Sequence, residues 1–304
     1  MTGNGLQGTE CLQALNDMCR SAALIHITSL DPVALRCGPV AVRWYTLAYI
    51  VGYLCVHISI KKSMGHGRLF PSRYLLFPWL PFAFVCMVFG ARLGWWLFYH
   101  RPGWNSEPWY EPVATWHGGM SFHGGAAGLF ISMLIWQGFS HRSMWSLADA
   151  CVLVVPAGLF LGRVANFMNG ELLGRPADLP WAVVLPGYTL PRHPSQLYEA
   201  LLEGPALFVS LYAYRKWCRP EIGELTAAFL ALYGAFRFLV EFTRLPDREI
   251  GYIAFGWLTM GQLLSATFTI MGMTLLFIFR KTSKNAQMRG TVETLVVLRF
   301  SKEG

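Results

Sequence analysis

The chain has 304 residues, of which 54% are apolar and only 14% are charged. A soluble domain carries about 25% charged residues, so the composition excludes an ordinary soluble protein and indicates a membrane protein. The formal net charge is +8. The basic residues stand in short clusters between apolar blocks and not in a stripe interleaved with aromatics, which argues against nucleic-acid binding.

Residues 1–30 form a polar extension, and residues 1–27 lack the basic start and apolar run of a signal peptide. Seven apolar blocks follow, and each has about the length that crosses a bilayer. They centre on Val42–His57, Leu75–Phe98, Phe122–Gln137, Leu147–Phe167, Gln196–Tyr214, Leu225–Phe242 and Phe255–Phe279. The seven cysteines include no CxxC pair, so we expect neither a metal site nor a disulfide framework.

Lys and Arg gather after the first, third, fifth and seventh blocks. The positive-inside rule then places the N-terminus outside and the C-terminus in the cytoplasm. The loops 100–121 and 168–195 therefore face outside, and residues 281–304 form a basic cytoplasmic tail. Within the second loop, Trp181–Leu185 predicts a short strand bounded by prolines. The predicted fold is an all-α membrane protein with seven transmembrane helices, a domain covering 31–280 and a small outer-face element between the fourth and fifth spans.

Charged residues at membrane depth cost about 2.5 to 3.5 kcal/mol each, so they mark candidate functional sites. The most polar segment, Gly162–Gly174, closes the fourth block. Arg163, Asn166 and Gly170 are spaced to share one helix face, and the chain then leaves the helix. A guanidinium beside amides and glycines suits an anionic oxygen such as a phosphate. The alternative is a helix end that extends Arg163 to the membrane interface.

Three further polar groups stand out. His117–Gly125 carries paired glycines, which permit close backbone approach to a ligand, and His123, which is a candidate base; a structural histidine is the alternative. Tyr233, Arg237 and Glu241 form one stripe on the sixth block, either as a self-satisfied ion pair or as part of a doubly cationic pocket with Arg163. His193 or Ser195, before the fifth block, caps a helix or acts directly.

The segment Gly162–Gly174 matches the signature G-R-x-[GA]-N-F-x-N-x-E-x-x-G at every fixed position, and the chain thus resembles the prolipoprotein diacylglyceryl transferase family. Further blocks agree in order: Arg43–Tyr45, Gly119–Gly125, His193–Glu199, Tyr233–Glu241 and Gly256–Gln262. The resemblance runs from about Asp31 to about Phe279. It departs from the family pattern at Thr46, where the family usually has glycine.

The resemblance implies a seven-span enzyme of the bacterial cytoplasmic membrane that needs no metal or soluble cofactor. Such an enzyme transfers the diacylglyceryl group of phosphatidylglycerol to the lipobox cysteine of a prolipoprotein signal peptide and releases glycerol 1-phosphate. Carried over by matching motifs, the important residues are Tyr45, His123, Arg163, Asn166, Glu171, Gly174, Tyr233, Arg237 and Glu241.

The expected mechanism follows from the charge that develops on the leaving phosphate. We expect Arg163 and Arg237 to stabilise that charge. His123 is expected to take the thiol proton, with Glu241 as the second candidate, and Glu171 to orient Asn166 or Arg163. The resemblance also implies a set of residues that bind phosphatidylglycerol: Tyr45, Arg163, Asn166, Glu171, Gly174, Tyr233 and Arg237. The rival hypotheses are a transporter or channel for an anionic solute, against which the absence of an internal repeat counts, and a non-catalytic lipid-binding scaffold.

Overall fold

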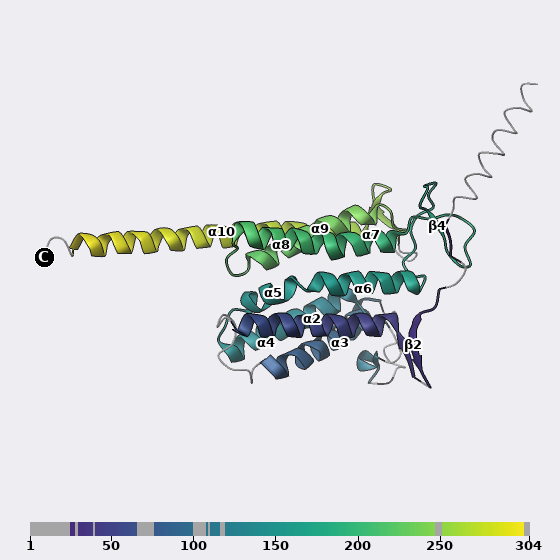
Figure 1. Ribbon diagram of the computed structural model, residues 1–304, viewed down its shortest axis with the longest axis horizontal. Coiled ribbons are helices and arrows are strands. Elements are labelled where there is room, and N and C mark those ends of the chain that lie inside the picture. The colour runs from purple at the N-terminus through teal and green to yellow at the C-terminus, as the bar shows by residue number, and fades with distance from the viewer. Residues whose placement is uncertain are drawn as a thin grey trace, which may run out of the picture. The chain divides into compact units, whose positions relative to one another are not determined.

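The computed structural model describes residues 25–27, 30–38, 40–65, 76–99, 108, 110–115, 119–246 and 251–300. The chain divides into two compact units. We call Leu54–Val152 the central unit, and Met1–Tyr53 together with Leu153–Gly304 the terminal unit. Helices dominate the described part of both units (Figure 1).

Helix α2 (Trp44–Gly65) begins in the terminal unit and ends in the central unit. The other central elements are α3 (Leu76–Tyr99), the 3-10 turn η2 (Glu111–Val113), α4 (Phe122–Ser140) and α5 (Met144–Val152). The terminal unit contains β1 (Ile25–His26), β2 (Val33–Cys37), β3 (Val40–Arg43), α6 (Val155–Met168), β4 (Val183–Val184), α7 (Ser195–Leu201), the π-helical η4 (Leu202–Ala206), α8 (Leu207–Cys218), α9 (Glu224–Glu241), β5 (Tyr252–Ala254), β6 (Leu258–Thr259) and α10 (Met260–Phe300).

The central unit is held by an aromatic and aliphatic core, which buries side chains from all four of its helices because each has an apolar face to cover. Its buried members are Ile60, Trp79, Leu80, Ala83, Trp136, Leu147 and Cys151.

Helices α3 and α4 pack with their backbones in direct contact, because glycines line both sides of the interface. A Cβ atom at Gly90 would lie 2.3 Å from the carbonyl oxygen of Gly124, and one at Gly128 would lie 2.0 Å from the carbonyl oxygen of Cys86. Small residues four apart allow this close approach between membrane helices. Gly124 belongs to the predicted ligand-approach segment His117–Gly125, and the structure gives it a packing role instead.

The terminal unit is built around a helical layer. Figure 1 shows α8, α9 and α10 lying side by side, and α9 packs against both neighbours. The fifth predicted span is a helical run from Ser195 to Cys218, in which the π turn that contains Pro205 joins α7 to α8. The fourth is broken into α5 and α6. The seventh was placed too early, since its helix begins at Met260, after the β5–β6 hairpin.

A small layer of extended segments lies at one end of the terminal unit. Strand β4 pairs in parallel with β1, and a bridge joins Val183 to Arg192. Further antiparallel bridges join Arg192 to Pro176 and Gly174 to Arg244. The predicted strand within Trp181–Leu185 is therefore confirmed, and it is completed by residues of the N-terminal segment that precedes the first span.

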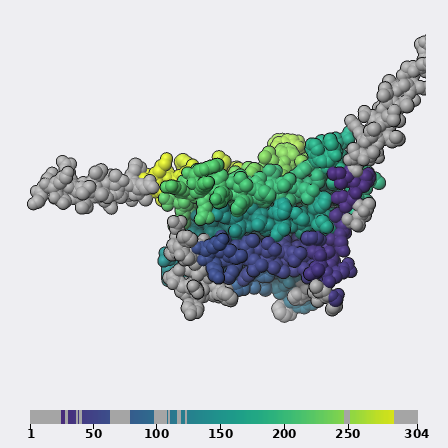
Figure 2. All heavy atoms as spheres, viewed as in Figure 1, coloured from purple at the N-terminus to yellow at the C-terminus, as the bar shows by residue number. Residues whose placement is uncertain are grey.

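Among the described helices, those that contain Trp79–Leu97 and Met260–Asn285 are long and apolar enough to cross a membrane. A third crossing is added if the bent pair α5–α6 counts as one span. Helix α8 lies on the surface drawn in green in Figure 2. Its side chains Phe208, Val209 and Tyr212 are exposed and apolar, which suits contact with lipid. These observations support a helical membrane protein, while the full number of seven crossings stays a prediction.

Candidate active site

The signature segment Gly162–Gly174 begins in α6 and reverses direction at the end of that helix. Gly170 adopts a φ of +67°, its N–H donates to the carbonyl of Phe167 (3.0 Å), and the N–H of Glu171 donates to that of Asn166 (3.0 Å). This pair of bonds is a Schellman motif, in which glycine supplies the left-handed residue that ends the helix. The prediction that Gly170 shares a helix face with Arg163 and Asn166 is therefore wrong, because Gly170 lies beyond the helix.

The reversal turns the Glu171 carboxylate back onto the helix that precedes it. Glu171 accepts hydrogen bonds from the Tyr45 hydroxyl (2.7 Å), Asn166 Nδ2 (3.2 Å) and Asn169 Nδ2 (3.1 Å). Asn166 Nδ2 also donates to the Tyr45 hydroxyl. The structure therefore brings Glu171 into contact with Asn166, one of the two residues that it was expected to orient, and Tyr45 joins the same network from the start of α2.

The first turn of α7 fixes this reversed loop from the other side. Gln196, which is buried, donates from Nε2 to the carbonyl of Glu171 (2.5 Å), and Ser195 Oγ donates to that of Leu172 (3.2 Å). The N-cap of α7 is Pro194, without a side-chain cap, so the capping role predicted for His193 or Ser195 is wrong. Burial and the neighbouring Arg175 lower the pKa of His193.

Arg163 points from α6 towards two glutamates on the fifth helical run. Its Nη1 lies 2.9 Å from Glu199 Oε2, and its Nε lies 3.0 Å from Glu203 Oε2. Both glutamate side chains are 0% exposed, whereas the side chain of Arg163 is 18% exposed. The two carboxylates therefore hold the guanidinium from its buried side and fix its orientation.

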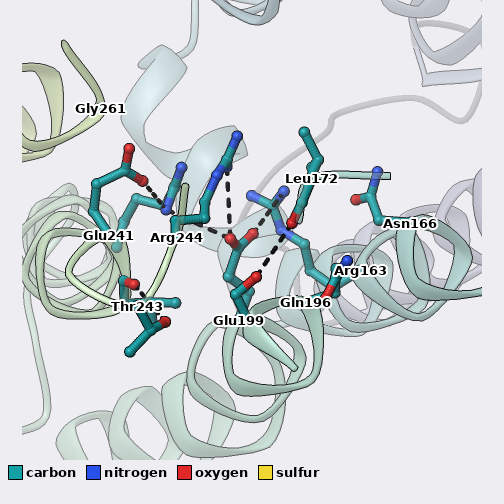
Figure 3. A network of polar contacts seen from close by, with 12 residues as sticks. Arg163, Asn166, Leu172, Gln196, Glu199, Glu241, Thr243, Arg244 and Gly261 are labelled. Carbon is teal, nitrogen blue, oxygen red and sulfur yellow. Dashed lines mark hydrogen bonds and ion pairs between the residues drawn. The ribbon is translucent and has the colours of Figure 1, made fainter. Parts of the chain in front are cut away.

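Arg237 on α9 reaches the same two carboxylates. Its Nη1 lies 3.6 Å from Glu199 Oε1, its Nε lies 3.9 Å from Glu203 Oε1, and its Nη1 also lies 2.6 Å from Glu241 Oε2. Arg244 adds a third guanidinium, with Nη1 at 3.5 Å from Glu199 Oε1. Figure 3 shows the Glu199 carboxylate between the side chains of Arg163 and Arg244.

Glu241 is in turn fixed by the start of α10. Thr259 Oγ1 donates to Glu241 Oε1 (3.1 Å), and its own N–H donates to Gln262 Oε1 (2.9 Å). The N–H of Gln262 returns a bond to Thr259 Oγ1, which completes a capping box. Gly261 leaves room for the carboxylate, because a Cβ there would lie 2.4 Å from Glu241 Oε1.

We call these six charged side chains the ion-pair cluster. Its members are Arg163, Arg237, Arg244, Glu199, Glu203 and Glu241. The prediction that Arg163 meets a second arginine is confirmed, since both contact Glu199. The prediction of a doubly cationic pocket is wrong, because the three guanidiniums of the cluster face three carboxylates and the formal charges cancel.

The remaining predicted residues lie in different surroundings. Tyr233 is buried and stacks on Phe229, with ring centroids 5.7 Å apart. Gly174 belongs to the extended layer, where a Cβ would lie 2.0 Å from the carbonyl oxygen of His193. His123 lies in the first turn of α4 in the central unit, and its side chain is outside the described residues. Its role as a base stays a prediction.

Sequence reasoning assigned no role to Glu199, Glu203 or Arg244. A signal was present, since two glutamates four residues apart stand inside an otherwise apolar block. Like Arg237, these glutamates are charged groups at membrane depth, where charges mark functional sites.

Comparison with known proteins gives a consistent picture. The family model described as prolipoprotein diacylglyceryl transferase matches residues 32–278. A phosphatidylglycerol–prolipoprotein diacylglyceryl transferase of Solidesulfovibrio magneticus is 43% identical over 249 residues, covering 81% of this chain and 93% of that protein. The enzyme of the same name from Bordetella avium is 42% identical over 267 residues, covering 86% and 98%. That from Sinorhizobium medicae is 43% identical over 259 residues, covering 82% and 92%.

Proposed function

Because this chain belongs to the prolipoprotein diacylglyceryl transferase family, we propose that its ion-pair cluster is the site of diacylglyceryl transfer. The enzyme moves the diacylglyceryl group from phosphatidylglycerol to the thiol of the lipobox cysteine of a prolipoprotein. The sulfur forms a bond to the glycerol carbon, and the bond from that carbon to the phosphate oxygen breaks. The electron pair stays on the phosphate, which leaves as glycerol 1-phosphate.

One observation carries the assignment of the site. Arg163 and Arg237 both contact the carboxylate of Glu199, at 2.9 and 3.6 Å. Two guanidiniums that reach one carboxylate can also reach one phosphate, which has similar oxygen spacing and binds arginine in the same way. Both arginines remain partly exposed, at 18% and 13%. Fixed cations beside the leaving phosphate stabilise the charge that grows there in the transition state.

The thiol proton needs an acceptor, because the thiolate is the nucleophile. In our proposal His123 takes it, with Glu241 as the second candidate. Both carboxylate oxygens of Glu241 are already engaged, Oε2 by Arg237 and Oε1 by Thr259. This engagement of Glu241 favours His123.

The other family residues are proposed to bind phosphatidylglycerol around the arginines. Tyr45, Asn166 and Glu171 form a polar network next to α6, which suits hydroxyl groups of the glycerol headgroup. Tyr233 and Gly174 contribute walls of the same site. Membrane lipid and the prolipoprotein signal peptide are the partners, and nucleic acid is not one.

For the membrane arrangement, we propose seven crossings of the bacterial cytoplasmic membrane, with the N-terminus outside and the C-terminus in the cytoplasm. The loops 100–121 and 168–195 and the active site then face outside. The polar extension 1–30 and the tail 281–304 flank the transferase domain 31–280. The extended layer around β4 is the small outer-face element.

The direct test is incubation of the purified chain with phosphatidylglycerol and a lipobox peptide, followed by mass analysis of the peptide. The proposal predicts a mass gain of one diacylglyceryl group on the cysteine, and no gain when that cysteine is replaced by serine. Flux of an anionic solute into reconstituted vesicles without peptide modification would support the rival transporter. The curated relatives, which are named as transferases, give that rival no support.

A further inference from the structure

In the ion-pair cluster the arginines are partly exposed, whereas Glu199 and Glu203 are fully buried. The side chains of Arg163, Arg237 and Arg244 are 18%, 13% and 11% exposed, whereas those of Glu199 and Glu203 are 0% exposed. The arginines thus offer an accessible side to a ligand and are held by carboxylates on the buried side. The carboxylates of Glu199 and Glu203 are ion-paired with these guanidiniums and therefore compete with any phosphate for the same positive charge.

This competition bears on the two phosphate species of the proposed reaction. Phosphatidylglycerol is a phosphodiester and carries one negative charge on its phosphate. Glycerol 1-phosphate is a phosphomonoester with a second pKa of about 6, so it carries nearly two charges at neutral pH. A cationic pair without buried carboxylates would hold the doubly charged product more strongly than the substrate. Each buried carboxylate reduces that preference.

We propose that the buried Glu199–Glu203 pair sets the charge of the arginine site so that it binds the monoanionic diester and releases the dianionic monoester. Glu203 is the specificity-determining residue that can be tested most cleanly. Glu203 contacts Arg163 and Arg237, the two arginines proposed to hold the phosphate, and Glu199 contacts Arg163, Arg237 and Arg244. The inference rests on the proposed function, because that function defines the two phosphates.

The position of Glu203 in the chain fits a role in the site. It lies in the π turn Leu202–Ala206, and such turns occur often at functional sites. The next residue, Gly204, packs against Phe160 of α6, where a Cβ would lie 2.7 Å from the Phe160 Cβ. The π turn therefore packs closely against α6, the helix that carries Arg163. This packing holds the Glu203 carboxylate beside the Arg163 guanidinium.

The experiment compares wild type with Glu203→Gln in the lipid-transfer assay, with glycerol 1-phosphate and inorganic phosphate as inhibitors. The amide keeps an oxygen that accepts from Arg163 Nε but removes the charge. We expect the inhibition constant for both phosphates to fall about tenfold at pH 7.5, as one charge a few ångströms away implies. The KM for phosphatidylglycerol changes less, because the diester carries one charge.

Two matched variants separate charge from geometry. Glu203→Asp keeps the charge and is expected to keep the wild-type inhibition constants. Glu224→Gln removes a buried carboxylate at the opposite end of α9, which bonds to the Tyr214 hydroxyl and lies about 25 Å along the helix from Glu241. It is expected to leave the inhibition constants unchanged. If Glu203→Gln does not accumulate, Glu199→Gln is measured in its place and is expected to change them in the same direction.

A second measurement uses pH. At pH 5 the product is mostly a monoanion, so the difference between wild type and Glu203→Gln should shrink to the smaller change expected for the singly charged diester. An unchanged or raised inhibition constant in Glu203→Gln, or the same fall in Glu203→Asp, overturns the inference. Failure of the wild type to transfer lipid would instead overturn the proposed function. In that case, calorimetric measurement of phosphate binding to Glu203→Gln and Glu203→Asp would still show whether the Glu203 charge weakens phosphate binding.

Discussion

Arg163 lies against Glu203 with its Nε at 3.0 Å and its Nη2 at 3.5 Å from the two carboxylate oxygens. This side-on pair leaves Nη1 for Glu199, at 2.9 Å. Removing one partner of a buried ion pair typically costs about 3 to 5 kcal/mol, because the other charge stays buried. The orientation of Arg163 is thus set by the fifth helical run and not by the signature segment that contains it.

The Tyr45–Glu171 hydrogen bond is predicted to support catalysis. Tyr45→Phe removes the hydroxyl that donates to Glu171 and accepts from Asn166. Hydrogen bonds to charged groups contribute about 1.5 to 3 kcal/mol, so transfer should fall at least about tenfold. Tyr49→Phe, one turn later and 59% exposed, is the control. Equal rates in the two variants would contradict a catalytic role for this network.

Gly174 is predicted to act through the packing of the extended layer. Gly174→Ala places a Cβ against the His193 carbonyl and should lower the Tm of the purified chain, whereas Gly162→Ala has nothing within 4 Å and should not. Thermal unfolding in detergent checks both. An unchanged Tm together with a raised KM for Gly174→Ala would contradict the packing role and favour contact with phosphatidylglycerol, as the family resemblance implies.

The α3–α4 contact offers a stability prediction in the central unit. Gly128→Ala drives a Cβ into the Cys86 carbonyl, and overpacking of this kind costs about 1 to 3 kcal/mol. Gly138, on the same helix, has no neighbour within 4 Å, and alanine there should stabilise the helix slightly. A Tm that falls for Gly128→Ala and holds for Gly138→Ala is expected, and equal Tm values would argue against the glycine interface.

His123 is predicted to be the proton acceptor, and the pH–rate profile of His123→Gln tests this. A general base must be unprotonated to act, so the wild-type rate should fall towards acidic pH. The glutamine variant should be much slower and should lose that acidic limb. An unchanged rate and profile would remove His123 from the role and leave Glu241 as the candidate.

The apolar blocks predicted the helical segments well, because a block of membrane length extends over many residues and tertiary contacts seldom override such a pattern. It also singled out Arg163, Asn166 and Glu171, since polar residues in apolar surroundings are conspicuous, and the structure places them in polar networks; their functional roles stay predictions. It misread Gly170, whose helix-ending conformation depends on two backbone hydrogen bonds that no spacing rule reveals. It misread Gly124 for a similar reason, since its packing partner lies on another helix.

The charge of the site was the largest error. Arg163 and Arg237 stand on different predicted spans, and their common partners stand on a third. Only the packing of α6, α7 and α9 brings them together. Periodicity within one helix showed that Arg237 meets Glu241, but it carries no information about which charges meet across helices.

The most direct test of the account is the rate of lipid transfer by Arg163→Ala, divided by the amount of folded protein in the membrane. Loss of a fixed group that stabilises transition-state charge typically costs about 100- to 1,000-fold. We expect a loss of at least that size, with Arg215→Ala, an exposed arginine on α8, retaining the wild-type rate. A full rate for Arg163→Ala would contradict the assignment of the ion-pair cluster as the site of transfer.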